Sequence, residues 1–186
     1  GCAPGTVVEV KRLFFNTPAR RKFLKSDAAE TTRVREVINN LAVAHADVSF
    51  SLCSNDRMLL ELPAMPTPRQ RLVALLGAEL EDELLEVEGT IEGCAIWGLV
   101  GCPQLARPTR RHLRICVNGR AVADASISHA LREAFRGLMA PGRWPTAAIF
   151  LEMDPAMVDV NVHPRKSEVR FRDRDAIWHL VHASVA

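Results

Sequence analysis

The chain has 186 residues, of which 48% are hydrophobic and 25% are charged, and its formal net charge is +2 at pH 7. This length allows one domain with a sizeable core or two small ones, and the composition is that of an ordinary soluble globular protein. The sequence has no apolar run near the roughly 20 residues of a membrane-spanning helix, and its net charge is too small to indicate nucleic-acid binding without local basic clusters.

The cysteines and histidines do not form a recognisable disulfide or metal pattern. Five cysteines occur without any C-x-x-C pair, so the sequence predicts neither a disulfide framework nor a zinc site. His179 and His182 lie three residues apart, but two ligands are too few for a metal ion. We therefore expect reduced thiols, no bound metal and a cytoplasmic protein.

The N-terminal part contains a strand-like run and two helix signals. Residues 5–10, GTVVEV, have the composition of a strand, and we expect them to continue a domain that precedes this sequence. Thr17 and Pro18 predict the start of a short basic helix. Apolar residues at helical spacing predict a long amphipathic helix over 27–46, with a stripe that packs on a sheet. That stripe consists of Val34, Val37, Ile38, Leu41, Ala42 and His45.

A hairpin is predicted after the long helix. Residues 48–54 and 57–62 have the composition of strands. Asn55-Asp56 lies between them, and both residue types tolerate the left-handed backbone of a tight turn. The two runs should therefore pair with each other.

A short helix and a second hairpin follow. Thr67-Pro68 has the chemistry of a helix start, and the helix should end at Gly77, where glycine suits a left-handed cap. Residues 84–88 and 94–100 are predicted as strands with a turn around Gly89.

The second half of the chain continues with strands and a helix. A third hairpin is predicted from strand 112–117, the turn Asn118-Gly119 and the return strand 120–123. Apolar spacing predicts an amphipathic helix over 127–138. The apolar run 147–153 is typical of an interior strand.

A C-terminal helix over 173–185 completes the predicted elements. Strands alternate along the chain with two long helices. This order indicates an α/β (α+β) two-layer sandwich, in which a mixed β-sheet carries helices on one face.

The segment 158–172 contains the most informative pattern. Alternating valines predict a half-buried strand, Pro164 ends it, and a second strand follows with Val169 and Phe171 pointing inward. The turn between the two strands would display Lys166. From spacing alone, the simpler interpretation of this turn is a solvated basic loop.

Three motifs resemble the signatures of the MutL family of DNA mismatch-repair ATPases. They are DVNVHPRKSEVRF at 159–171, FFNTPARRKFL at 14–24 and VNGR at 117–120, and their order and spacing also fit. The resemblance implies that residues 14–186 are a transducer domain with the second-domain fold of ribosomal small-subunit protein five. Residues 1–13 would be the terminal strand of the preceding ATPase domain or a linker.

The resemblance also implies a shared site for ATP. Lys166 matches the family's loop lysine that contacts the γ-phosphate, and Thr6 would form part of the nucleotide pocket. A lysine suits that role because it neutralises charge that develops on the transferred phosphoryl group. The sequence itself has no P-loop, G-x-S-x-G or H-E-x-x-H motif. We therefore expect ATP and Mg²⁺ to bind the full-length protein, and the isolated chain to be inactive.

DNA contact is the second predicted function. Aromatic residues are scarce and tyrosine is absent, which favours sequence-independent contact with the backbone of duplex or single-stranded DNA. Part of the basic set resembles an arginine-rich motif of the family. The candidate residues are Arg20, Arg21, Lys22, Arg120, Arg132 and Arg136, and the cluster Arg107, Arg110, Arg111 and Arg114 offers further phosphate partners.

The family resemblance implies partners as well. These are the preceding ATPase domain, a mismatch-recognition protein and other repair factors, and a second copy of the full-length protein in a dimer, located at the nucleoid if the protein is bacterial. Two alternatives stay open: the transducer domain of a type II topoisomerase or ATP-driven heat-shock chaperone, and a pure protein-interaction module. The FFNTPARRKFL segment favours mismatch repair over both.

Overall fold

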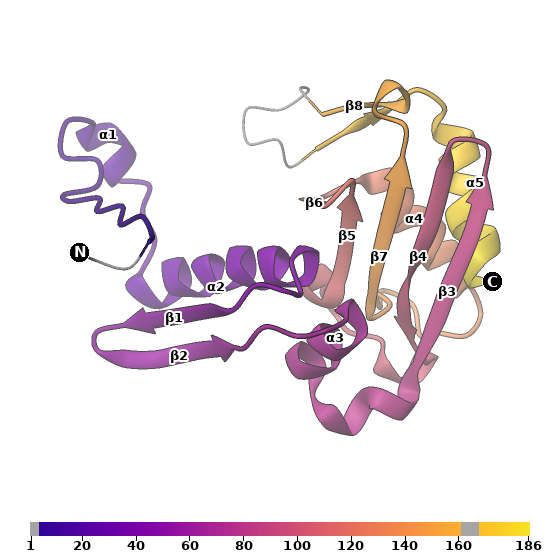
Figure 1. The fold of residues 1–186 in the computed structure, drawn as a ribbon, viewed down its shortest axis with the longest axis horizontal. Helices are drawn as coiled ribbons and strands as arrows, with labels where there is room; N and C mark the ends of the chain where they lie inside the picture. The colour runs from indigo at the N-terminus through magenta and orange to yellow at the C-terminus, as the bar shows by residue number, and fades with distance from the viewer. Residues whose placement is uncertain (1–3, 161–167) are drawn as a thin grey trace. The chain divides into compact units, whose positions relative to one another are not determined.

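The computed structural model describes residues 4–160 and 168–186, and Figure 1 shows its fold. Contacts divide the chain into two compact units, Gly1–Val34 and Arg35–Ala186. Within the described ranges, no helix is long and apolar enough to cross a membrane. The predicted domain boundary after residue 13 stays a prediction.

The first unit contains the short helix α1 (Pro18–Arg21) and the start of α2 (Asp27–Ala44). Pro18 occupies the first helical turn as predicted, but the Thr17 hydroxyl makes no capping hydrogen bond. The strand predicted for residues 5–10 is absent from this described part, and Val7 is 95% exposed. An extended segment becomes a strand only when a neighbour pairs with its backbone, and residues 5–10 pair with no described strand.

Helix α2 buries only a small part of the stripe that its apolar spacing predicts. Val34, Val37 and Leu41 are exposed, whereas Ala42 and Val43 are buried near the C-terminal end of the helix. Periodicity identifies apolar positions, but the neighbouring elements decide which of them are covered. The stripe prediction was therefore wrong for most of its length.

The predicted hairpin after α2 is confirmed. Strands β1 (Phe50–Ser54) and β2 (Arg57–Leu62) pair antiparallel and form a two-stranded sheet of their own. Asn55 and Asp56 have φ values of 49° and 59°, the left-handed backbone that a tight two-residue turn requires.

Helix α3 (Pro68–Leu76) is fixed at both ends by the predicted residues. The Thr67 side chain accepts a hydrogen bond from the Gln70 amide, and Gly77 follows the helix with φ of 118°. Arg71 in this helix is completely buried, and its Nη2 donates to the carbonyl oxygens of Ala46, at 2.9 Å, and Val48, at 2.6 Å. Its Nε and Nη1 have no hydrogen-bond partner among the described residues. Burial lowers the pKa of this guanidinium.

A five-stranded mixed sheet forms the centre of the second unit (Figure 1). Its strands are β3 (Leu84–Ile91), β4 (Cys94–Gly101), β5 (Leu113–Val117), β6 (Arg120–Val122) and β7 (Ala147–Met153). Their order is β3-β4-β7-β5-β6, with β5 and β7 parallel and the other neighbours antiparallel. This arrangement confirms the predicted fold class.

The turn between β3 and β4 lies later than predicted. Gly89 belongs to β3 and pairs with Ile96, while Gly93 in the turn has φ of 73°. A positive φ is the conformation that favours glycine. Short 3₁₀ helices complete the connections in the described chain at Ala78–Glu83, Pro103–Leu105, Arg110–His112 and Pro155–Met157.

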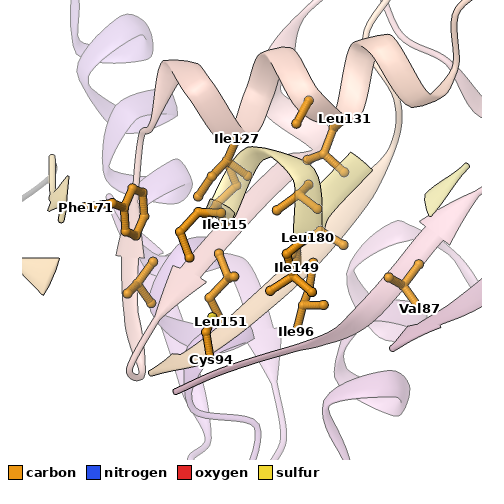
Figure 2. Packing of buried hydrophobic residues seen from close by; sticks show 14 of the residues in the cluster. Val87, Cys94, Ile96, Ile115, Ile127, Leu131, Ile149, Leu151, Phe171 and Leu180 are labelled. Carbon is orange, nitrogen blue, oxygen red and sulfur yellow. The ribbon is translucent and has the colours of Figure 1, made fainter. Parts of the chain in front are cut away.

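Helices α4 (Ala125–Ala134) and α5 (Arg174–Val185) cover one face of the sheet and enclose the main core, which Figure 2 shows from close by. Both helices begin at an aspartate cap: Asp124 accepts from the Ile127 amide and Asp173 from the Ala176 amide, each at 2.9 Å. Such caps satisfy amides that the helix leaves unpaired. Helix α4 ends before Leu138, which is 66% exposed, so the prediction that Leu138 belongs to the buried stripe was wrong.

The opposite face of the sheet carries a smaller buried cluster. Leu72 of α3 and Val43 of α2 pack there with residues of β4, β5 and β7. Trp97 and Phe150 stack on this face with ring centroids 4.0 Å apart. Because side chains alternate along the central strands, buried side chains lie on both faces of the sheet.

Cys116 in β5 gives a pH prediction. Its thiol is 2% exposed, and burial raises its pKa from 9.0 to about 11. Between pH 9 and 11 the folded chain therefore holds a proton that the unfolded chain releases, so folding stability should fall as pH rises, by at most about 2 kcal/mol. Urea unfolding of the wild type and Cys116→Ala across this range measures the difference. Equal slopes of stability against pH in the two proteins would contradict the assignment.

Candidate functional site

The ends of the lysine-bearing segment are anchored in the main core. Strand β8 (Val158–Asp159) pairs antiparallel with β9 (Arg170–Phe171), with Val158 opposite Phe171. Val158, Val169 and Phe171 are all buried in the main core cluster. The predicted inward positions of Val158, Val169 and Phe171 are therefore confirmed, although both strands are shorter than predicted.

Lys166 itself lies outside the described residues, as does the predicted turn at Pro164. Among the described residues, the two ends of this segment are held in place by the pairing of β8 with β9 and by burial in the core. The amide of Arg172 also donates to the Met157 carbonyl oxygen at 2.8 Å, which extends the pairing of β8 and β9. The role of Lys166 stays a prediction.

The other predicted nucleotide residue and the first basic group belong to the first unit. Thr6 is exposed and lies outside any helix or strand. Arg20 and Arg21 end α1, and Lys22 caps it, with all three exposed. Their side chains point to no described partner, so their predicted roles in binding ATP or DNA stay untested.

The second basic group is divided between two places. Arg120 begins β6 and is exposed, directly after the turn at Asn118-Gly119. Arg132 lies on α4, and Arg136 follows that helix and forms an ion pair with Glu133. The structure therefore does not bring Arg120, Arg132 and Arg136 into one described contact.

Arg110 and Arg132 both lie over the ring of Trp144, a contact that was not predicted from the sequence. The guanidinium carbons of Arg110 and Arg132 lie 5.5 and 4.8 Å from the ring centroid of Trp144. Strands β5 and β7 are parallel, so the residues just before them, which include Arg110 and Trp144, come together at one end of the sheet. Arg107 and Trp144 also exchange two backbone hydrogen bonds of 2.8 Å.

A cavity of about 290 Å³ adjoins this contact and is lined by Arg110, Arg111 and Arg114, together with Glu36, Asn40 and Ser128. Arg114 is buried and donates to the Asn40 Oδ1, and burial lowers the pKa of its guanidinium. Arg111 lies 3.5 Å from Glu36. The cavity is thus a half-enclosed basic site that suits an anion.

Charged side chains surround His112 beside this cavity. The pKa of His112 is lowered first by burial and then by the nearby charges of Arg107 and Arg114. His112 is therefore neutral at pH 7, and no described group of three His, Cys, Asp or Glu side chains is placed to hold a metal ion. The arginines supply the positive charge of this region.

Comparison with known proteins identifies the family. Residues 72–186 match the protein-family model described as DNA mismatch repair protein, C-terminal domain. The chain is 46% identical over 184 residues to the DNA mismatch repair protein MutL of Pseudomonas fluorescens (strain SBW25), and 43% identical over 182 residues to that of Sinorhizobium medicae (strain WSM419). These alignments cover 97% of this chain but 29% and 30% of the two relatives, so the chain spans about three-tenths of their length.

Two solved structures share the fold. One is the N-terminal domain of a DNA repair protein, with a TM-score of 0.75 and 20% identity over 91% of this chain and 56% of that one. The other is the Aquifex aeolicus MutL ATPase domain complexed with ADP, with a TM-score of 0.63 and 21% identity over 92% of this chain and 55% of that one. With the family match over residues 72–186 and the three signature motifs, these findings show that the chain belongs to the MutL family of DNA mismatch repair proteins.

Proposed function

We propose that this chain is the transducer part of an ATP-driven mismatch-repair protein, which couples ATP binding and hydrolysis in an adjacent domain to a change of conformation. The observation that carries the proposal is the signature segment 159–171, whose flanking strands β8 and β9 are anchored in the main core. A segment whose two ends are fixed in the core could carry a force from a bound ligand into the sheet. Family membership supports the same assignment.

Lys166 is the residue of this chain that we assign to the γ-phosphate of ATP. ATP with Mg²⁺ supplies the phosphoryl group, and a lysine ammonium would offset the charge that develops on it during hydrolysis. The same contact would tell the transducer whether a γ-phosphate is present. Thr6 would line the pocket, and residues outside this chain would supply the rest of the nucleotide and metal site.

The preceding ATPase domain is the first partner in this proposal. Exposed apolar side chains in each of the two units support it, because large apolar side chains left exposed on a globular protein can mark an interface. They occur in the first unit at Val7, Val8 and Phe15, and along α2 at Val37 and Leu41. A domain that covers either group would remove its side chains from water.

DNA, repair factors and a second copy complete the proposed partners. The basic residues Arg20, Arg21, Lys22, Arg120, Arg132 and Arg136 would contact the phosphate backbone without reading base sequence. A mismatch-recognition protein would recruit the dimeric full-length protein to DNA in the cytoplasm, at the nucleoid if the protein is bacterial. Family membership decides against the topoisomerase and chaperone alternatives. The interaction-module alternative predicts that Lys166 has no part in ATP turnover.

The 186-residue chain alone should not bind ATP with useful affinity. Most of the pocket would lie in the adjacent domain, and the surviving contacts of Thr6 and Lys166 cannot repay the entropy of holding a nucleotide. Calorimetric titration with a non-hydrolysable ATP analogue and Mg²⁺ should give a Kd weaker than about 1 mM. Micromolar binding would contradict the view that this chain supplies one edge of the site.

A further inference from the structure

Strand β3 forms one edge of the five-stranded sheet, and no described strand pairs with its outer side (Figure 1). It pairs with β4 at every position from Leu84, opposite Gly101, to Ile91, opposite Cys94, without a bulge. Proteins usually protect such an edge by short length, a bulge, proline or charged side chains. Of these protections β3 has only charges, and all of them are negative. The strand can therefore accept a further strand of suitable charge.

The backbone groups of every second β3 residue point away from β4. The Cys102 amide donates to the Glu83 carbonyl oxygen at 2.9 Å, which continues the pairing of β3 with β4 by one residue pair. In an antiparallel ladder, directly opposite residues exchange hydrogen bonds at every second pair. Counted in steps of two from Glu83, the odd-numbered residues bond to β4. Glu86, Glu88 and Thr90 therefore present their amide and carbonyl groups at the free edge.

A groove of about 730 Å³ lies between this edge and α5, and Ile91 and Leu180 are among its apolar walls. Gly89 faces α5, since a Cβ there would stand 2.2 Å from the Ser184 Oγ. Residues 88–92 all line the groove. Because successive strand residues point to opposite faces, the groove reaches around the edge of the sheet. A strand added to β3 would place every second side chain in it.

Carboxylates along the edge favour a basic partner. Glu86 and Glu88 are two residues apart and share the face of the sheet opposite α5. Arg69 lies 3.2 Å from Glu86, whereas Glu88 has no ion-pair partner among the described residues. A strand with lysine or arginine on this face would gain charge pairs across the two strands. The chain has no lysine or arginine between Arg71 and Arg107, and this stretch contains Glu79, Glu81, Asp82, Glu83, Glu86, Glu88 and Glu92.

A second copy of β3 does not fit this edge. Pairing β3 with the same strand of another molecule would bring Glu86 and Glu88 close to the same two residues of that molecule, and like charges on paired strands destabilise a sheet. On the α5 side of the edge, Leu85 and Ile91 are 55% and 36% exposed. The strand that fits is therefore apolar on the α5 side and basic on the other.

We propose that the free edge of β3 binds an extended segment of a partner protein, in which lysine or arginine alternates with apolar residues. The segment adds a strand to the sheet, with its apolar side chains in the groove beside α5 and its cationic side chains beside Glu86 and Glu88. Backbone hydrogen bonds supply affinity in this mode of binding, and the alternating side chains supply specificity. None of the residues assigned to ATP or DNA belongs to β3, so the inference does not depend on those assignments.

The test is fluorescence anisotropy of the full chain with a labelled peptide of about nine residues in which lysine and valine alternate. Binding should saturate below about 1 mM protein. The formal net charge of +2 gives the chain no general attraction for a cationic peptide. Two control peptides, with proline in place of valine or glutamate in place of lysine, should bind about 10-fold more weakly or less. Absence of saturable binding of the lysine–valine peptide would overturn the proposal.

Two changes on β3 separate the backbone contact from the charges. Thr90→Pro removes an outward amide and no bond to β4, so Tm should stay within about 5 °C while the peptide affinity falls about 10-fold. Glu86→Lys/Glu88→Lys should weaken binding by a similar factor, and it decides the matter if Thr90→Pro does not fold. Glu61→Lys, at an exposed position of β2, is the matched control and should bind normally. Wild-type affinity in the double lysine variant would contradict the edge site.

Amide hydrogen exchange, measured by NMR, locates the contact. At saturating peptide the amides of Glu86, Glu88 and Thr90 should exchange about 10-fold more slowly or better. The amides of Val87 and Gly89 should change little, because they already bond to β4. Peptide binding without this alternating protection would place the contact away from the edge and overturn the proposal.

The oligomeric state of the chain decides between a partner segment and a second copy. Analytical ultracentrifugation should show that Thr90→Pro leaves the oligomeric state of the wild-type chain unchanged. A dimer of the wild type that Thr90→Pro dissociates would make a second copy the occupant of the edge, and the basic partner segment would be wrong.

Discussion

Replacing Lys166 by alanine in the longer protein that contains this chain is expected to lower ATP turnover by roughly 10²- to 10³-fold. The reason is electrostatic: a charge-assisted contact to the transferred phosphoryl group stabilises the transition state by about 3 to 4 kcal/mol. The loss should appear mainly in kcat, because the contact strengthens as charge develops. Steady-state ATPase assays, with thermal unfolding of the same samples, measure both turnover and stability.

Val169→Ala is the control that separates catalysis from folding. Val169 is 5% exposed in the main core, so its truncation should cost about 1 to 3 kcal/mol of stability and reduce turnover only through unfolding. Arg170→Gln, at an exposed position of β9, should change neither quantity substantially. Near-normal turnover in Lys166→Ala would show that the segment is a solvated basic loop, as the interaction-module alternative requires.

Gly98→Ala is expected to destabilise the fold more than any surface change, by about 3 to 5 kcal/mol. Gly98 lies in β4 with φ of 154°, and a Cβ there would stand 2.1 Å from the Ala148 carbonyl oxygen and 3.0 Å from the Ile149 Cα of β7. Both obstacles are backbone atoms of the neighbouring strand, so no side chain can rotate away. The two central strands would have to separate.

Gly142→Ala provides the matched control for this prediction. Gly142 also has a positive φ, of 77°, but a Cβ there would meet nothing within 4 Å. Its substitution should cost about 1 to 2 kcal/mol, from backbone strain alone. Urea unfolding of both variants measures the difference between strain and collision. A Gly98→Ala protein no less stable than Gly142→Ala would show that the approach of β4 and β7 is looser than described.

Local chemistry allowed much of the fold to be predicted. The turns at Asn55-Asp56 and Asn118-Gly119 were predictable because these residue types accept a positive φ, and all four residues have one. Helix α3 was predictable from Thr67 and Gly77, because a cap is an interaction between residues close in sequence. In each case the determining contact lies within a few residues.

Contacts between distant elements explain the failures. Leu41 and Leu138 have helical spacing, yet both are exposed, because the elements that pack nearby cover other positions. The turn assigned to Gly89 lies at Gly93 instead, since a strand with one glycine inside it can continue when its neighbour pairs across that position. Composition alone does not reveal such a neighbour.

The candidate sites also differ in whether local sequence or contacts between distant elements determine them. Lys166 was proposed because it matches a motif and lies in a predicted turn that would display it. Trp144 with Arg110 and Arg132 could not be found in this manner, because the parallel pairing of β5 and β7 brings the segments together.

The buried guanidinium of Arg71 has a mechanical consequence. One nitrogen holds the carbonyl oxygens of Ala46 and Val48, so sliding α3 away from the segment after α2 would break both bonds at once. It would also strand a cation inside the protein, where an uncompensated charge costs on the order of several kcal/mol. Arg71 therefore fixes α3 to the segment that follows α2. A displacement of the segment that carries Ala46 and Val48 is therefore expected to move α3 as well, and Leu72 of α3 packs on the sheet.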